Sequence, residues 1–361
     1  MKIAFLNDGA YAYASGNSRA VGGTERDIWL LSRALAAKGW FVVVGVRDGI
    51  SARERVVIDA VEYVGVGHGP ILMEWYRFLS SERPDWLFWQ GASHLWGPLV
   101  EIAKLAGVRT IFSLQYDTEA DPRRALVWRP RWWPLYAWGL LRTNKIFVQH
   151  TGQLSMLPPG WQSKSYLLPK VGSLPTTVRP HFERPKYVAW VAMLRQPKRP
   201  DLLIEIARRA PDIQFVVCGG KSNYQTPPEY GQRIVDALHA LPNVDYRGQV
   251  APEEARQVIA DAALLLSTSD GEGFPNTFVQ AWSSGTPVVS LTIDPDEIIQ
   301  RKGLGSVEGS LEKAIAEIEA LMGTPGLRDE IAGRARRHVK ETYSEAVVIG
   351  AFEKAIRGVR E

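Results

Sequence analysis

The feature of this chain that most constrains its fold is the alternation of short apolar runs with longer amphipathic stretches. The segments 2–6 (KIAFL) and 40–46 (WFVVVGV) contain almost only apolar residues. Such runs are typical of strands in a parallel sheet that helices cover on both faces. Between them, the pattern predicts a helix with Thr24 as its N-cap that continues to Lys38. A strand, a helix and a second strand in this order predict an α/β fold.

The alternation falls into two blocks of similar size. In the first block, further strands are predicted at 56–64, 86–90, 109–114 and 145–149, with helices at 70–81 and 96–106. In the second, strands are predicted at 187–193, 213–218, 244–247, 263–267 and 287–291, with helices at 200–209, 229–240, 276–284, 311–321 and 327–341. Residues 171–186 contain three prolines and no apolar run, which is typical of a linker. We therefore predict two α/β domains, 1–170 and 187–343, as the length of 361 residues suggests.

The composition excludes several classes of function. Hydrophobic residues make up 45% and charged residues 23%, which is typical of a globular protein, and a net charge of +4 is too small to indicate nucleic acid as the partner. The single cysteine, Cys218, excludes an intramolecular disulfide and a Cys-rich zinc site, and no two of the six histidines have helical ligand spacing. There is no apolar run long enough for a bilayer and no signal-peptide pattern, so we expect a cytoplasmic protein.

One segment carries the strongest chemical signal. After the predicted strand that ends at Ser267, a polar loop with two glycines (270–273) leads to Pro275 and Asn276. These two residues open a predicted helix, which Gly285 closes. Loop glycines let the backbone approach a ligand, and the free N–H groups of a helix start suit a phosphate. In open α/β sheets, ligands bind at the carboxyl ends of the strands, where we expect this loop. Taken alone, the pattern also fits an ordinary strand-to-helix loop.

The same segment resembles the donor-site signature of the retaining glycosyltransferases of family four, in which Glu-Gly-Phe-x-Asn/Ser is followed by Glu-Ala-x-x-x-Gly-x-Pro-Val. Here the signature reads Glu272-Gly273-Phe274-Pro275-Asn276-Thr277-Phe278-Val279-Gln280-Ala281-Trp282-Ser283-Ser284-Gly285-Thr286-Pro287-Val288. The second glutamate of the family pattern is therefore Gln280 in this chain. The resemblance implies the GT-B fold, an α/β fold of two Rossmann-like domains that face each other across a cleft. It also implies that an amphipathic C-terminal helix, 344–361, packs back on the first domain.

Other parts of the chain extend the resemblance. Gly22-Gly23-Thr24-Glu25 is similar to the family's N-terminal glycine loop, and 242–250 is similar to the strand and turn whose backbone reads the nucleobase. Lys198 matches the phosphate-binding lysine of the family. The family's usual Gly-Arg pair is replaced by Ala192-Met193, so we expect Arg195 to supply the missing guanidinium.

The resemblance implies a nucleotide-diphosphate sugar as the donor, with neither a cofactor nor a metal. Lys198, Arg195 and the helix start at Asn276-Thr277 would stabilise the charge of the leaving diphosphate. Glu272 would bind hydroxyls of the donor sugar, and the amide oxygen of Gln280 would accept from the ribose. The expected donor-binding residues are Gly22, Gly23, Lys198, Arg195, Val250, Glu272, Gly273, Phe274, Asn276, Thr277 and Gln280. As alternatives, 195–200 fits a solvated charge cluster, and Gln280 fits a solvent-facing helix residue.

Two residues of the first block are candidates for the acceptor side of the reaction. His94 follows the predicted strand 86–90, and Asp117 follows the strand 109–114. Both are expected at carboxyl ends of strands, where a substrate binds. The alternative is that each is a loop residue with a local hydrogen bond. A strict general base is not required if the reaction retains the anomeric configuration by a front-face path, because the leaving phosphate can take the proton of the acceptor.

The segment 123–145 combines six basic residues, no acidic residue and four tryptophans. Arginine together with tryptophan is typical of a surface that contacts a membrane, because the rings suit the headgroup level and the cations suit anionic lipids. The alternative is a helix that buries its tryptophans in the domain core. The membrane interpretation fits a lipid-linked acceptor and peripheral contact with the inner face of a membrane.

From the sequence we therefore expect a retaining glycosyltransferase that moves a sugar from a nucleotide-diphosphate sugar to a saccharide or lipid-linked acceptor, in cell-surface glycan synthesis. Two alternatives remain open at this point. One is a phosphorylase or epimerase with the same fold. The other is a pseudoenzyme that binds a nucleotide or a carbohydrate, which the departures at Gln280 and Met193 suggest.

Overall fold

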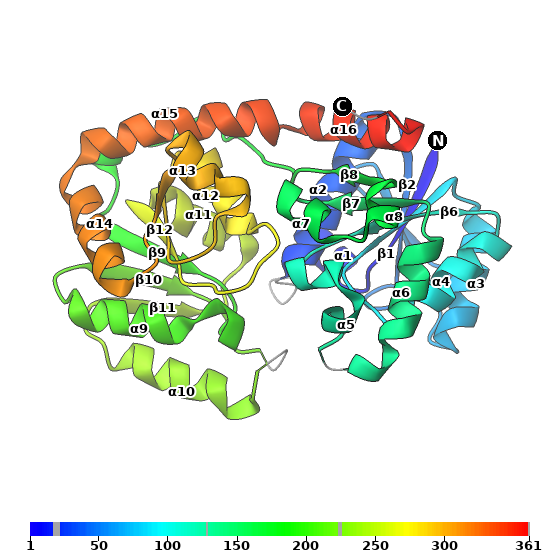
Figure 1. Cartoon of the computed structure of the whole chain (residues 1–361), viewed down its shortest axis with the longest axis horizontal. Coiled ribbons are helices and arrows are strands. Elements are labelled where there is room, and N and C mark those ends of the chain that lie inside the picture. The colour runs from blue at the N-terminus through cyan, green and yellow to red at the C-terminus, as the bar shows by residue number, and fades with distance from the viewer. Residues whose placement is uncertain (17–21, 128, 223–225, 360–361) are drawn as a thin grey trace. The chain divides into compact units, whose positions relative to one another are not determined.

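A computed structural model describes residues 1–16, 22–127, 129–222 and 226–359. The chain forms two compact units, which we call the first domain (residues 1–171 with 345–361) and the second domain (residues 172–344). Each domain contains one sheet with helices packed against it (Figure 1). The last helix of the chain thus belongs to the first domain, although the whole second domain precedes it in the sequence.

The strands of the first domain are β1 (Lys2–Leu6), β2 (Phe41–Val46), β3 (Arg55–Ile58), β4 (Val61–Gly65), β5 (Trp86–Gln90), β6 (Arg109–Ser113), β7 (Lys145–Val148) and β8 (Ser165–Leu167). They form one sheet in the order β3-β4-β2-β1-β5-β6-β7-β8. All neighbouring pairs are parallel except β3 and β4. The helices are α1 (Ala10–Ala14), α2 (Gly23–Ala37), α3 (Ile71–Glu82), α4 (Trp96–Leu105), α5 (Pro122–Ala125), α6 (Trp133–Arg142), α7 (Thr151–Met156), α8 (Pro159–Gln162) and α16 (Glu345–Arg357).

Both faces of the first sheet are buried, which is why its strands are apolar throughout. Along β1, Ile3 and Phe5 belong to a core that includes apolar residues of α2 and α16. Ala4 and Leu6 point to the other face and join a core with α3, α4 and α6. Because successive side chains of a strand alternate between faces, one continuous apolar run supplies both cores. Phe352 of α16 packs edge-on against Trp40 in the first of these cores, and Figure 1 shows α16 beside α2.

Two glycines bring α4 and α6 unusually close together. A Cβ atom on Gly139 of α6 would lie 2.4 Å from Cδ1 of Trp96, and a Cβ atom on Gly97 of α4 would lie 2.3 Å from the carbonyl oxygen of Leu135. Neither space admits a side chain. The C-terminal end of α6 is held separately by Lys164, whose ammonium donates to the carbonyls of Leu140 and Leu141, at 2.7 Å each, and of Thr143, at 2.8 Å.

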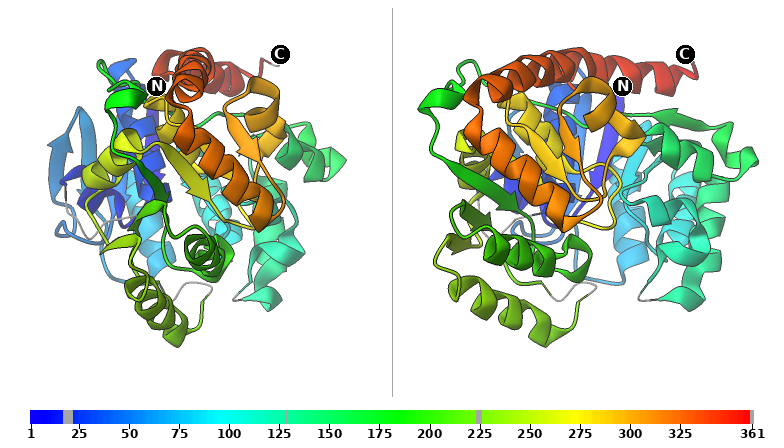
Figure 2. Two further views of the ribbon diagram at one scale, coloured as in Figure 1. Left: turned by 90° about the vertical axis from the view of Figure 1, so that its left-hand side faces the viewer. Right: turned by 60° about the vertical axis from the view of Figure 1, so that its left-hand side comes forward.

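The second domain contains a six-stranded sheet in which all neighbouring strands are parallel. Its strands are β9 (Tyr187–Val191), β10 (Gln214–Cys218), β11 (Val244–Gly248), β12 (Leu264–Ser267), β13 (Val288–Ser290) and β14 (Gly305–Val307), in the order β11-β10-β9-β12-β13-β14. Its helices are α9 (Pro200–Arg209), α10 (Pro228–His239), α11 (Pro252–Asp261), α12 (Asn276–Ser283), α13 (Ile298–Lys302), α14 (Leu311–Gly323) and α15 (Pro325–Thr342). Figure 2 shows this domain from two further sides.

Two local predictions were wrong, and some elements were missed. The predicted strand 56–64 is a hairpin of β3 and β4, because Asp59 and Ala60 turn the chain with φ angles of 51° and 62°. The N-cap of α2 is Gly22, not Thr24, which lies inside the helix. The helix α11 was not predicted at all.

The segment 171–186, predicted as a linker, has few regular elements but is firmly attached to the second domain. His181 and Arg184 are both buried. Arg184 donates to the hydroxyl of Thr286 at 2.9 Å and to the carbonyl of Ser284 at 2.7 Å. Nε2 of His181 donates to the carbonyl of Gly285 at 2.9 Å. The segment thus has little regular structure, as its prolines predict, but it is packed against the second domain and is not a free linker.

Candidate active site

The topology of the second sheet marks one position for a ligand. β9 lies between β10 and β12. After β9 the chain adds β10 and β11 on one side of it, and then β12, β13 and β14 on the other side. In open α/β sheets, the loops at the carboxyl ends of two such strands form the ligand crevice. Here these are the loops 192–198, after β9, and 268–275, after β12. We call these two loops the second-domain edge.

Lys198 and Glu272 meet at the second-domain edge. The ammonium of Lys198 donates to the carboxylate of Glu272, and the two residues form an ion pair. Their side chains are only 15% and 9% exposed, so this pair is much more shielded from water than an ordinary surface pair. From the sequence, both residues are predicted to bind the same donor molecule, Lys198 at its diphosphate and Glu272 at its sugar. The structure places these two side chains in direct contact with each other.

Hydrogen bonds hold the two loops of this edge together. The hydroxyl of Thr268 donates to the carbonyl of Lys198 at 2.7 Å and accepts from Nε1 of Trp190 at 2.9 Å. The amide of Asp270 donates to the carbonyl of Pro197 at 3.1 Å. Hydrogen bonds between the two loops therefore position Lys198 and Glu272, in addition to their own ion pair.

The basic residues around Lys198 differ in their partners. Arg195 precedes the short 3-10 helix Gln196–Lys198 and is half-buried in the same loop as Lys198. Arg199 has a left-handed backbone, with φ of 50°, and its guanidinium pairs with Asp201 at 2.8 Å and with Asp270 at 3.7 Å. The stretch is therefore not simply a solvated charge cluster. Nothing in the structure tests the diphosphate role of Arg195, which stays a prediction.

The helix α12 begins at Asn276, directly after Pro275 as its N-cap. The first two residues, Asn276 and Thr277, are half-buried, while Gly273 and Phe274 before them are buried. Phe274 packs against Trp282 and Tyr343, with ring centroids 6.2 Å and 5.6 Å away. The side chain of Phe274 thus anchors the loop in the core of the domain, directly before the half-buried helix start.

Gln280 lies one turn into α12. The helix buries Phe278, Val279 and Ala281, whereas Gln280 is half-exposed. Its side chain forms no hydrogen bond with any residue that the structure describes. The amide is therefore available to a ligand, but the predicted ribose contact remains untested.

The loops after β10 and β11 complete this side of the sheet. A Cβ atom on Gly219 would lie 1.8 Å from the carbonyl oxygen of Ala192, so only glycine fits beside the loop after β9. The amide of Gly219 donates to the carbonyl of Gly248 at 2.7 Å. Val250 is half-buried just after β11, at the position expected for the nucleobase turn. Gly219 was missed in the sequence, although it directly follows an apolar strand.

In the first domain, the glycine loop leads straight into α2. Gly22 is the N-cap and Gly23 the first helical residue, and residues 17–21 of the loop lie outside the described residues. A Cβ atom on Gly22 would lie 1.7 Å from Oε2 of Glu25. The carboxylate of Glu25 therefore lies over Gly22 at the positive end of the helix dipole, where an anion is stabilised.

His94 and Asp117 follow neighbouring strands, β5 and β6, as predicted, but each has a close partner. Nη1 of Arg129 lies 2.8 Å from Nε2 of His94. Oδ1 of Asp117 accepts from Nε2 of His150 at 2.8 Å and from Nε2 of Gln153 at 3.1 Å. We call the loops after β5, β6 and β7, which carry these residues, the first-domain edge.

Sequence reasoning missed His150, Gln153 and Glu119. His150 comes two residues after β7, so the rule that singled out His94 and Asp117, a polar residue after a strand, also applies to it. Glu119 is buried, and its carboxylate accepts from the amides of Gln115 at 2.7 Å and Ala92 at 3.1 Å. Burial raises the pKa of Glu119 to about 7. This carboxylate fastens the loop that carries Asp117 to the loop that carries His94.

A buried ion pair lies in the same domain. The ammonium of Lys170 is 2.5 Å from Oδ2 of Asp27, a residue in the first turns of α2. Lys170 also donates to Oε1 of Gln115 at 3.3 Å, and Gln90 donates to Asp27 at 3.2 Å. The network joins the start of α2 to the ends of β5 and β6. It was not visible in the sequence, because its members are far apart along the chain.

The segment 123–145 exposes the three tryptophans that the structure describes. Trp132, Trp133 and Trp138 are 50%, 37% and 47% exposed, and Trp128 lies outside the described residues. The helix α6 buries only Tyr136, Gly139 and Leu140. The alternative in which the tryptophans fill the domain core is therefore wrong for these three residues.

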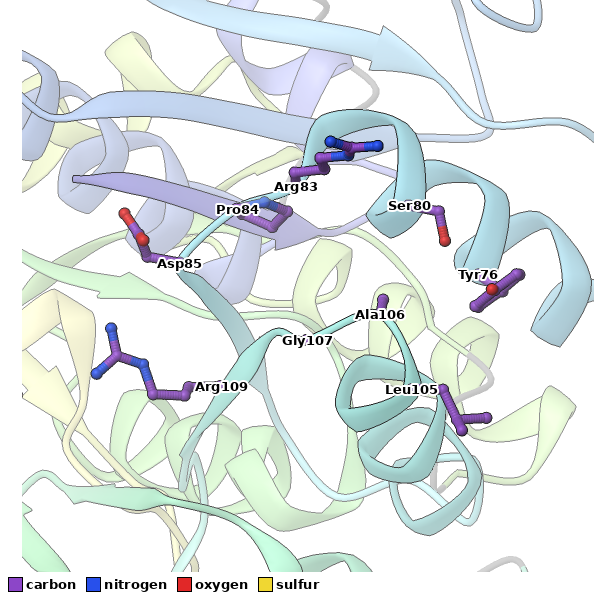
Figure 3. A pocket seen from close by; sticks show the side chains of 9 residues that line it. All are labelled: Tyr76, Ser80, Arg83, Pro84, Asp85, Leu105, Ala106, Gly107 and Arg109. Carbon is purple, nitrogen blue, oxygen red and sulfur yellow. The ribbon is translucent and has the colours of Figure 1, made fainter.

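A hollow of about 460 Å³ lies elsewhere in the first domain (Figure 3). It is lined by Tyr76, Ser80, Arg83, Pro84, Asp85, Leu105, Ala106, Gly107 and Arg109. These residues lie at the ends of α3 and α4 and at the starts of β5 and β6, so the hollow is at the end of the sheet opposite to the first-domain edge. Figure 3 shows the side chain of Arg109 near that of Asp85, whereas Arg83 points away from Asp85, and the hollow brings no candidate residue together.

Within the residues that the structure describes, no group of three or more His, Cys, Asp or Glu side chains is placed to hold a metal ion. Over the same residues, no helix has the length and apolar character needed to cross a membrane.

Comparison with known proteins agrees with this geometry. Residues 185–323 match the family model described as "Glycosyl transferases group 1". This part of the chain is a group 1 glycosyl transferase domain. The match contains both loops of the second-domain edge, including Lys198 and Glu272.

Curated relatives resemble the chain over shorter stretches. A D-inositol 3-phosphate glycosyltransferase of Mycolicibacterium smegmatis is 28% identical over 152 residues, which is 42% of this chain and 33% of the relative. An alpha-galactosylglucosyldiacylglycerol synthase of Streptococcus pneumoniae is 26% identical over 160 residues, 44% of this chain and 42% of the relative. The chain thus matches less than half the length of either relative.

Solved structures match the whole chain. A sucrose-phosphate synthase of Thermosynechococcus elongatus has a TM-score of 0.78 at 14% identity, and the match covers 99% of this chain and 98% of that one. HepE of Anabaena, in complex with UDP and glucose, has a TM-score of 0.75 at 12% identity and covers 99% and 100%. The chain that contains the group 1 glycosyl transferase domain therefore has the GT-B fold. The predicted GT-B fold and the predicted assignment to the glycosyltransferases are both confirmed.

Proposed function

We propose that this chain transfers a glycosyl unit from a nucleotide-diphosphate sugar to a saccharide or lipid-linked acceptor, with retention of the anomeric configuration, in cell-surface glycan synthesis. The observation that carries the proposal is the meeting of Lys198 and Glu272 at the second-domain edge. This pair combines an ammonium that can bind phosphate with a carboxylate that can accept hydrogen bonds from sugar hydroxyls. Both residues lie in the part of the chain that matches the group 1 glycosyl transferases.

The donor would bind to the second domain through its charges. Lys198 and Arg195 would neutralise the diphosphate, and the N–H groups at Asn276 and Thr277 would add the positive end of the α12 dipole. These groups stabilise charge that grows as the glycosidic bond breaks, so they would act mainly in the transition state. Glu272, once its partner contacts phosphate, would orient the sugar hydroxyls.

Metal independence is part of the proposal, since Lys198 and Arg195 supply the positive charge that a divalent cation would otherwise supply. Turnover should be nearly unchanged after dialysis against EDTA. A loss of turnover that manganese or magnesium restores would show that this part of the proposal is wrong.

The acceptor would bind to the first domain, at the first-domain edge. Two of the relatives suggest its class by their names, an inositol phosphate and a glycolipid. Oδ1 of Asp117 is occupied by His150 and Gln153, which orients the carboxylate and leaves Oδ2 for an acceptor hydroxyl. A lipid-linked acceptor agrees with the exposed tryptophans of the segment 123–145.

We propose that this segment docks on anionic membranes. Trp132, Trp133 and Trp138 would lie at headgroup level, and the neighbouring arginines would contact lipid phosphates. Replacing Trp132 and Trp133 by Ser should reduce sedimentation with phosphatidylglycerol vesicles, and salt should weaken the binding of the parent. Phe182→Ser is the matched control, because Phe182 is 71% exposed but belongs to the second domain. Equal sedimentation of all three proteins would contradict docking through this segment.

The decisive test of the function has two stages. A thermal-shift screen with UDP, GDP, ADP and TDP identifies the nucleotide, because a bound ligand raises the unfolding temperature. Hydrolysis of the corresponding nucleotide sugars, followed by NMR, then shows whether the α or β anomer is released. Binding without hydrolysis, with any acceptor present, would favour a binding protein without activity. Release of a sugar 1-phosphate that requires added inorganic phosphate would favour a phosphorylase.

A further inference from the structure

His94 is in direct contact with the surface segment that we propose for membrane docking. Its loop lies between β5 and α4, and Nε2 of the ring is 2.8 Å from Nη1 of Arg129. A guanidinium can only donate a hydrogen bond, so Nε2 must accept and the ring is neutral, with its proton on Nδ1. The ring of Trp132 lies 5.9 Å away. Burial, together with the charge of Arg129, lowers the pKa of His94.

The same contact blocks the atom that an acceptor would need. A neutral imidazole can accept a proton or a hydrogen bond only through its unprotonated nitrogen, which here is Nε2. As long as Arg129 donates to Nε2, His94 cannot assist an acceptor hydroxyl. The structure thus shows His94 in an occupied state.

Arg129 has a weak partner in His94 and would bind more strongly to an anion. The side chains of Arg123, Arg124, Arg129 and Arg131 are exposed, and none of them pairs with a carboxylate among the described residues. Arg142, in the same segment, is different, because it pairs with Glu101 at 3.1 Å. Charge-assisted bonds from arginine to phosphate are stronger than bonds to a neutral acceptor. A phosphate at this surface would therefore compete with the imidazole for Arg129.

We propose that an anionic lipid headgroup draws Arg129 away from His94 when the segment 123–145 docks, so that Nε2 is released for the acceptor. This inference rests on the proposed function in two respects, membrane docking and an acceptor site at the first-domain edge. It adds a coupling between them. The reaction would be slow in solution and faster at the surface where a lipid-linked acceptor is found.

The test measures the accessibility of Nε2 directly. Diethyl pyrocarbonate modifies neutral, unprotonated imidazole nitrogens, and peptide mass spectrometry gives a separate rate for each histidine of the full chain. Phosphatidylglycerol vesicles should raise the rate at His94 about 3- to 10-fold, which is the order expected for the release of one hydrogen bond. Phosphatidylcholine vesicles should leave it unchanged. His68, which is exposed, serves as the internal control in every sample.

Two variants separate the coupling from general effects of lipid. Arg129→Ala should raise the His94 rate without vesicles, and vesicles should then add nothing further. Arg142→Ala should keep the low rate and the vesicle response of the parent, because Arg142 is paired with Glu101. A His94 rate in Arg129→Ala equal to that of the parent would overturn the inference.

Further outcomes also decide against it. Vesicles that bind the protein but leave the His94 rate unchanged, or lower it, would overturn the coupling while docking itself stands. An equal rise with inorganic phosphate would show that a free anion, not a lipid surface, releases the histidine. Because the labelling requires no glycosyl transfer, a failure of the proposed function appears in the hydrolysis assay and not here.

Discussion

The two edges of the molecule hold their polar groups in different ways. At the second-domain edge, Lys198 and Glu272 pair with each other, and each lies in a loop that the sequence marks by glycines, prolines or a helix start. At the first-domain edge, Asp117 and His94 pair with residues of other loops, His150 and Arg129, and the sequence marks Asp117 and His94 only by their positions after predicted strands. Phosphate recognition by backbone N–H groups requires a particular backbone course, which leaves a signature in sequence. Recognition by side-chain networks does not.

The first prediction tests whether the pair at the second-domain edge is the chemical centre. Lys198→Ala should reduce kcat/KM of donor hydrolysis or transfer by about 30- to 1000-fold, since losing one shielded charge contact costs roughly 2–4 kcal/mol. Arg208→Ala, an exposed basic residue of α9, is the matched control and should change kcat/KM little. A Lys198→Ala enzyme within about threefold of the parent would remove the phosphate role.

The second prediction separates the partner of Lys198 from nucleotide binding. Glu272→Gln keeps the shape of the side chain but removes its charge, so kcat should fall by about 10- to 100-fold, as for a lost charged hydrogen bond of roughly 1.5–3 kcal/mol. The dissociation constant of the bare nucleotide diphosphate should stay the same or become smaller, because Lys198 loses a competing partner. Calorimetry measures this constant. Weaker nucleotide binding in Glu272→Gln would contradict a role on the sugar.

The sequence predicts the strands whose two faces are both buried, because such strands are apolar along their whole length. The apolar runs that became β1, β9 and β12 have both faces buried, so their composition alone identified them. The hairpin of β3 and β4 was mistaken for one strand, because its two-residue turn at Asp59 and Ala60 contains neither glycine nor proline. Aspartate is common in turns, but one aspartate between two apolar runs is a weaker signal than glycine or proline.

The candidate sites show the same limit. The glycine loop and helix start at 270–276 were found, but Glu119 and the Lys170–Asp27 pair were not. Lys170 and Asp27 are 143 positions apart, and only the packing of α2 against the ends of β5 and β6 brings them together. A single sequence has no feature that relates such positions.

The third prediction contrasts the two domains in their response to pH. Burial raises the pKa of Glu119 in the first domain from 4.5 to about 7 and lowers that of His181 in the second domain from 6.5 to about 4. The contribution of Glu119 to stability is full below pH 4.5 and is lost as pH rises through 7. That of His181 is full above pH 6.5 and is lost as pH falls toward 4. Acidification from pH 7 to pH 5 should thus stabilise the first domain and destabilise the second.

Hydrogen exchange with mass spectrometry, corrected for intrinsic rates, reports on each domain separately. Each group should shift the free energy of local unfolding by on the order of 1–3 kcal/mol, since one pKa unit corresponds to about 1.4 kcal/mol. Glu119→Gln should remove the response of the first domain only. His181→Gln, which retains a donor for the carbonyl of Gly285, should remove that of the second domain only. Equal and parallel responses of both domains in the parent would refute the contrast.

The last prediction returns to the position where this chain departs from the family signature. Gln280 lies on the half-exposed side of α12, one turn beyond the helix start, and its amide forms no hydrogen bond with the described residues. If the amide accepts from the ribose, Gln280→Ala should weaken binding of the nucleotide diphosphate by about 1–2 kcal/mol, the range for a lost neutral hydrogen bond. Gln280→Glu should be tolerated, because a carboxylate also accepts from hydroxyls. Unlike Glu272→Gln, Gln280→Ala should leave kcat at saturating donor nearly unchanged, since the ribose is remote from the bond that breaks. Calorimetry that gives the same dissociation constant for Gln280→Ala and the parent would make Gln280 an ordinary helix residue and place the ribose contact elsewhere in the second domain.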